Sequence, residues 1–210
     1  MPGQNNITSV ITGDIINSRK IKNKVWLTGL KKTLSVEGKS PATWQVYRGD
    51  SFQVEIKDPG LSFLTAIRIK ATIKCIKDLD VRMAIGIGKK EFTASAITES
   101  NGEAFIHSGE TLEGLKKEKQ SLAIKTPWPD FDQEMNVCFH LALIAMDNWT
   151  RSSAELIRIL IDKPTMKQKA LARKLKISQS SVSERQKRSS FDEIMELEAL
   201  FHQKVKRLTL

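Results

Sequence analysis

Two aspartates in this sequence stand where a carboxylate could do chemistry. Asp14 ends an apolar run that is typical of a buried strand, directly after Gly13, and Asp50 stands with Gly49 at the tip of a predicted hairpin. Two carboxylates that meet at one sheet edge can hold Mg²⁺, which takes one or two protein carboxylates and completes its coordination with water and phosphate oxygens. Gly and Asp are also common turn residues, so both aspartates could instead only cap turns.

Polar and basic residues near the two aspartates suit contacts with phosphate. The backbone carbonyl of Ile15 is a candidate third metal ligand. The predicted nucleotide-binding residues follow the first strand or flank the hairpin tip, and they are Asn17, Ser18, Arg19, Lys20, Arg48 and Gly49. This part of the chain therefore predicts a site for a nucleotide with Mg²⁺, while the catalytic nucleophile that phosphoryl transfer would need is not readable.

A small sheet has to bring the two aspartates together. The predicted elements are, in order, a strand over 7–16, a helix over 23–36, a hairpin over 43–56, a helix over 61–76 and a strand over 81–87. This order favours helices packed on one face of a mainly antiparallel sheet. A hairpin beside the first strand would bring Asp50 close to Asp14.

A proline-rich stretch, TPWPD, is the predicted domain boundary. Before it, a further helix over 102–117 and a late strand, SLAIKT, complete an α+β domain assigned to residues 1–126. After it, residues 127–210 carry only helical patterns. The sequence thus predicts a mixed domain followed by an all-α domain.

The second constellation lies at about residues 166–188 of the helical part. Apolar residues at the spacing of two packed helices are Leu171, Ala172, Leu175 and Val182. Ser178 can cap the second helix. This spacing resembles helix-turn-helix regulators, whose second helix enters the major groove. The residues that would then face DNA are Lys174, Lys176, Gln179, Ser180, Ser183, Arg185, Gln186, Lys187 and Arg188. The alternative is a three-helix protein-interaction domain.

The charge distribution agrees with a nucleic-acid partner. The chain has 210 residues and a net charge of +10, and the segment from Lys163 to Arg188 holds nine basic residues against one acid, a net +8. A basic block of this kind can attract DNA, although it can also be a solvated face. A hydrophobic content of 40% with no apolar run near the roughly 20 residues that cross a bilayer predicts a cytoplasmic protein without membrane contact.

Three short motifs carry a resemblance to known proteins. GDI at 13–15, RGDSF at 48–52 and RMAIGIG at 82–88 resemble the palm-like core shared by class III nucleotide cyclases and GGDEF-type dinucleotide cyclases. With the helical tail added, the chain resembles the SatD family from about residue 7 to its end. The resemblance implies a ferredoxin-like, palm-type sheet covered by helices, with Asp14 and Asp50 as metal-binding acids. Ser51 departs from the GGDEF pattern, which carries an acid there.

These observations lead to one main hypothesis and two alternatives. The main one is a cytoplasmic DNA-binding regulator, acting as a homodimer, whose palm-like domain senses a nucleotide with Mg²⁺. The first alternative is an active, cyclase-like enzyme that processes a nucleotide. The second is a protein-interaction module with neither activity.

Overall fold

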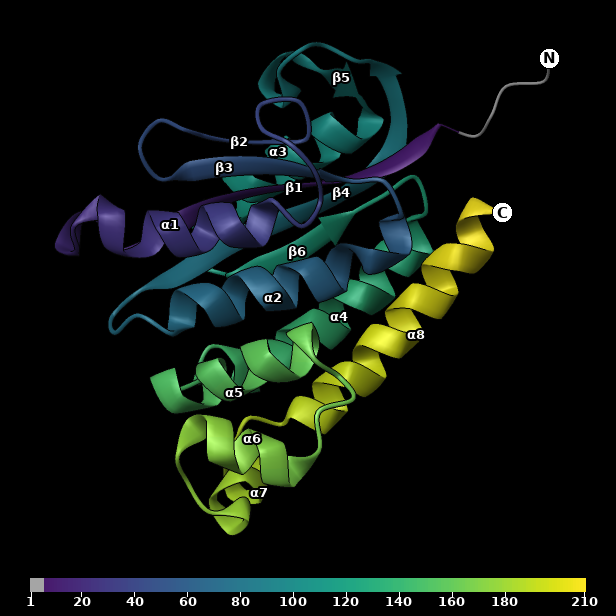
Figure 1. Ribbon diagram of the computed structural model, residues 1–210. Helices are drawn as coiled ribbons and strands as arrows, with labels where there is room; N and C mark the ends of the chain where they lie inside the picture. The colour runs from purple at the N-terminus through teal and green to yellow at the C-terminus, as the bar shows by residue number, and fades with distance from the viewer. Residues whose placement is uncertain (1–5) are drawn as a thin grey trace.

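The computed structural model describes residues 6–210 as a mixed α+β protein (Figure 1). The strands are β1 (Ile7–Ile16), β2 (Trp44–Tyr47), β3 (Ser51–Ile56), β4 (Asp80–Phe92), β5 (Asn101–Gly102) and β6 (Leu122–Lys125). The helices are α1 (Asn23–Leu34), α2 (Ser62–Lys74), α3 (Glu103–Glu118), α4 (Pro129–Met146), α5 (Arg151–Asp162), α6 (Gln168–Leu175), α7 (Gln179–Arg188) and α8 (Phe191–Thr209). Within residues 6–210, no helix combines the length and the apolar character that crossing a bilayer requires.

The sheet has the strand order β2-β3-β1-β4-β5, and β6 pairs with β4. β1 is antiparallel to both of its neighbours, β3 and β4, while β6 runs parallel to β4. The register sets Asp14 of β1 opposite Ser51 of β3 on one side and opposite Arg82 of β4 on the other. The predicted antiparallel sheet and its hairpin are confirmed.

Helices cover both faces of the sheet, so the prediction of helices on one face was wrong. In Figure 1, α3 lies on the opposite side of the sheet from α1 and α2. Because strand side chains alternate between faces, Ile11 and Ile85 join the core under α1 and α2, whereas Val10 and Ala84 belong to small clusters beneath α3. Gly86 of β4 lets α3 approach, since a Cβ there would lie 2.1 Å from the carbonyl oxygen of Ala104.

One hydrophobic core extends from the sheet into the C-terminal helices. Phe63 of α2, Phe139 of α4 and Phe201 of α8 pack together within it, with their rings tilted. The ring centroids of Phe63 lie 4.6 Å from Phe139 and 5.7 Å from Phe201. The core therefore crosses the boundary predicted at residue 126, with α4 and α8 packed on the α+β part, and the division into two domains stays a prediction.

Helices α5, α6 and α7 share a second, smaller core. Its buried members are Leu156, Ile159, Leu171, Ala172 and Val182. Trp149, just before α5, donates a buried hydrogen bond from its indole Nε1 to the carbonyl oxygen of Ser189, at 2.9 Å, just after α7. This bond ties the two ends of the three-helix unit together.

Candidate functional site

The structure brings Asp14 and Asp50 together at the end of β1. Asp14 lies opposite Ser51, the residue that follows Asp50, and the backbone N–H of Ile15 donates to the carbonyl oxygen of Asp50 at 3.1 Å. Partial burial is the main cause that raises the pKa of Asp14, and the nearby negative charge of Asp50 raises it further. The predicted meeting of the hairpin tip with the first strand is therefore present, because β3 pairs with β1 in this register.

Two cationic side chains that are not among the predicted site residues face Asp14. The Nη1 atom of Arg82 lies 3.3 Å from both carboxylate oxygens of Asp14, and the Nζ atom of Lys116 lies 4.0 Å from Oδ2. Partial burial raises the pKa of Asp14, and the charges of Arg82 and Lys116 act in the opposite direction. Arg82 stands in the RMAIGIG motif, but only the register of β4 against β1 reveals its partner.

Asp50 is held by a residue from the segment after β1. The hydroxyl of Ser18, which is buried, donates to Oδ2 of Asp50 at 2.5 Å. Ser18 therefore orders the carboxylate. Asn17 has a left-handed backbone, with φ of 64°, and its side chain donates to the carbonyl oxygen of Asp78.

The remaining four predicted nucleotide-binding residues are exposed. Arg19 and Lys20 form the exposed end of the 3₁₀ turn Ser18–Lys20, and Arg48 and Gly49 form the exposed hairpin tip with φ values of 52° and 90°. None of these four is needed to hold the core. Their side chains or backbone are thus accessible to an anionic ligand.

The donor atoms around Asp14 and Asp50 fit a hard cation only in part. Residues 6–210 contain no group of three or more His, Cys, Asp or Glu side chains that could hold a metal. A cation would depend on the two carboxylates, on the carbonyl of Ile15, and on oxygens of water or phosphate, which is a donor set that Mg²⁺ accepts. Arg82 now neutralises Asp14, so a metal ion bound by Asp14 would have to displace that guanidinium.

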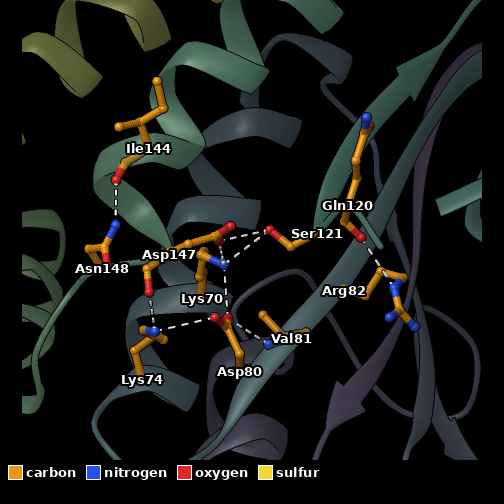
Figure 2. Close-up of polar contacts among 10 residues, drawn as sticks. All are labelled: Lys70, Lys74, Asp80, Val81, Arg82, Gln120, Ser121, Ile144, Asp147 and Asn148. Carbon is orange, nitrogen blue, oxygen red and sulfur yellow. Dashed lines mark hydrogen bonds and ion pairs between the residues drawn. The ribbon is translucent and has the colours of Figure 1, made fainter. Parts of the chain in front are cut away.

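An ion network around a buried lysine supports the strand that carries Arg82 (Figure 2). Lys70 of α2 is fully buried, and its Nζ lies 2.8 Å from Oδ1 of Asp80 and 2.6 Å from Oδ1 of Asp147. The hydroxyl of Ser121 donates to Asp147 at 2.9 Å. The network joins α2, the start of β4, the start of β6 and the end of α4. It therefore fixes the end of β4 from which Arg82 reaches Asp14.

The residues predicted to face DNA lie on α6, α7 and the turn between them. Lys176 ends α6 in a left-handed conformation, with φ of 55°. Ser178 caps α7 and accepts a hydrogen bond from the N–H of Ser181 at 3.1 Å. The exposed members of the predicted set are Lys174, Lys176, Gln179, Ser180, Lys187 and Arg188.

Three members of this predicted set are partly buried. The hydroxyl of Ser183 accepts a hydrogen bond from Gln168 of α6 at 2.9 Å, and the side chain of Gln186 donates to Asp192 of α8 at 2.6 Å. These two bonds hold α7 against its neighbours. Arg185 is half-buried near the C-terminal end of the same helix.

A model of the SatD family matches residues 8–196, which is most of the chain. A search of curated proteins finds no match.

Proposed function

This chain belongs to the SatD family, and we propose that it is a DNA-binding regulator whose α+β part binds a nucleotide together with Mg²⁺. The observation that carries the proposal is the α6–α7 pair, which has a capped second helix, a core of its own and a strongly basic surface. In a helix-turn-helix, such a second helix enters the major groove. The proposal includes a homodimer, because two recognition helices one helical turn of DNA apart read a two-fold symmetric site.

The arrangement of the α+β part supports a palm-like sensor. The elements β1, α1, β2, β3, α2 and β4 follow the β-α-β-β-α-β order of ferredoxin-like folds. Asp14 and Asp50 end up at one sheet edge, next to the cations Arg82 and Lys116. Carboxylates that bind Mg²⁺ and cations that bind phosphate oxygens are the two groups that a nucleoside triphosphate requires.

We expect Arg185→Ala to weaken DNA binding about tenfold and to lower its salt dependence. Each neutralised phosphate contributes roughly 0.9 to the slope of log K against log salt, so the loss of one contact should reduce that slope by about 1. Fluorescence anisotropy with a generic duplex, measured from low to physiological salt, gives both quantities. Lys39→Ala, which removes an exposed lysine before β2, is the matched control. An unchanged slope in Arg185→Ala would contradict a role of α7 at the phosphates.

We expect Asp14→Asn to abolish the effect of Mg²⁺ on nucleoside triphosphate binding. Asparagine keeps the shape of the side chain but removes the charge that holds the cation, so affinity measured with Mg²⁺ should fall more than tenfold. Titration calorimetry with ATP and with GTP, each with Mg²⁺ or with EDTA, provides the measurement. Lys116→Gln serves as a comparison, because it should weaken binding with and without Mg²⁺.

Product analysis of the same samples separates a sensor from an enzyme. Chromatography of wild-type protein incubated with ATP or GTP and Mg²⁺ should show the nucleotide bound and unchanged. A new product that disappears in Asp14→Asn would establish the enzyme instead. If neither ATP nor GTP binds, the Asp14–Asp50 site is rejected, and the DNA-binding part of the proposal is unaffected.

A further inference from the structure

A cleft of about 380 Å³ is lined by residues of α1, α2, α5 and α6. Five basic side chains line it, and they are Lys32, Arg68, Arg158, Lys163 and Lys174. Two acids, Glu155 and Asp162, also line it. The lining thus carries three more positive than negative charges. This cleft is separate from the Asp14 site, because Asp14 faces Lys116 of α3 on the other side of the sheet.

Arg68 projects its guanidinium from α2 and is poorly satisfied. Its side chain is 16% exposed, and its nearest carboxylate atoms are Oδ1 of Asp162 at 3.5 Å and Oε1 of Glu37 at 3.9 Å. Within the part of the chain that the structure describes, its Nε atom is buried and makes no hydrogen bond. A guanidinium prefers two parallel hydrogen bonds to a carboxylate or phosphate, at about 2.7–2.9 Å. Neither neighbouring acid provides that geometry here.

Apolar and hydroxyl groups complete the wall of the cleft. Val36 just after α1, Ile159 of α5 and Leu175 of α6 provide apolar surface. Thr33 and Thr72 also line it, with hydroxyl oxygens 3.0 Å apart. Mixed walls of this kind suit a ligand with an organic part and a charged group, and the volume lies at the small end of the range of about 300–1,000 Å³ for ligand pockets.

We propose that this cleft binds a small organic phosphate of the size of a nucleoside monophosphate. The phosphate pairs with Arg68, with Lys32, Arg158 and Lys163 contributing positive charge, and the organic part lies against Val36, Ile159 and Leu175. Such a ligand would contact α1 and α2 of the α+β part and, at the same time, α5 and α6 of the three-helix unit. An effect of the ligand on DNA binding rests on the proposed function, whereas binding itself does not.

Titration calorimetry of the full chain in EDTA tests the proposal with AMP, GMP, CMP and UMP as probes and adenosine as the uncharged control. EDTA removes the divalent cation that the Asp14 site requires, and Asp14→Asn repeats the measurement without that site. At least one monophosphate should bind, and Arg68→Gln should weaken it at least tenfold. Adenosine should bind at least tenfold more weakly than AMP if AMP is the ligand that binds.

Matched lysines make the test specific to the cleft. Lys32→Ala should weaken binding several-fold, and Lys31→Ala, its exposed neighbour on α1 that does not line the cleft, should leave it unchanged. Should Arg68→Gln lower stability, the double variant Lys32→Ala/Arg158→Ala replaces it, because both side chains are exposed. The proposal is overturned if none of the four monophosphates binds, or if binding survives unchanged in the cleft variants; its loss in Asp14→Asn would then place the ligand at the Asp14 site instead.

Discussion

Lys70→Met will lower the free energy of unfolding by about 2 kcal/mol, because the buried ammonium of Lys70 makes charge-assisted contacts with Asp80 and Asp147, and hydrogen bonds to charged groups contribute about 1.5–3 kcal/mol. Lys70 is the central cation of the network in Figure 2, where it holds Asp80 and Asp147. Methionine keeps the length and the apolar stem of lysine but removes the charge. The loss should stay below the roughly 3–5 kcal/mol of a fully buried pair, since the side chains of Asp80 and Asp147 are 20% and 46% exposed and Lys74 still lies 3.2 Å from Asp80. Urea denaturation followed by circular dichroism measures it.

Two further variants separate charge from packing at Lys70. Lys31→Met, at an exposed position on α1, should change the free energy of unfolding by less than about 0.5 kcal/mol. Adding Asp147→Asn to Lys70→Met should restore part of the lost stability, because one uncompensated carboxylate is then removed. A loss below about 1 kcal/mol in Lys70→Met would show that the network contributes little.

Gly86→Ala will also destabilise the protein by about 3 kcal/mol, at the upper end of the usual cost of overpacking. The added Cβ would lie 2.1 Å from the carbonyl oxygen of Ala104 and 2.5 Å from the backbone nitrogen of Ser108. Both atoms belong to the backbone of α3, so the helix must move away from the sheet. That movement would also draw Lys116 away from Asp14. Urea denaturation again gives the change.

Gly109→Ala is the matched control for Gly86→Ala. Gly109 lies in α3 itself, and a Cβ added there meets no atom within 4 Å. Because alanine favours a helix over glycine by up to about 1 kcal/mol, this variant should be neutral or more stable. Equal destabilisation by both substitutions would show that α3 does not depend on its close approach to Gly86.

The contact at Gly86 also decides between two meanings of the glycines in RMAIGIG. The sequence alone allows a close approach either of backbone or of ligand. A Cβ at Gly88 would lie 2.6 Å from the Cβ of Glu103, so both glycines accommodate α3. The motif therefore serves helix packing in its second half, while Arg82 at its start belongs to the site with Asp14.

Local patterns were sufficient to predict the elements that carry the site. The alternating run that becomes β1, the two strand runs around Gly49 and Asp50, and the capped helix after Ser178 each depend on neighbours in sequence. The meeting of Asp14 with Asp50 was predictable as well, because a hairpin in a small sheet must pair with an adjacent strand. These features are set by residues a few positions apart.

Long-range pairing decided the rest, since a register shift of one residue turns every side chain of a strand to the opposite face. Arg82 is opposite Asp14 only in the observed register of β4 against β1. The placement of α3 on the second face follows from the same register, which points Ala84 and Gly86 away from α1 and α2. Lys70 on a helix would ordinarily be expected at the surface, and its burial is favourable because Asp80 at the start of β4 and Asp147 at the end of α4 both pair with it. Residues close together in the sequence therefore set the local elements and the charges that these elements carry. Which charges meet depends on the packing of the whole sheet with its helices, because contacts between distant segments form only then.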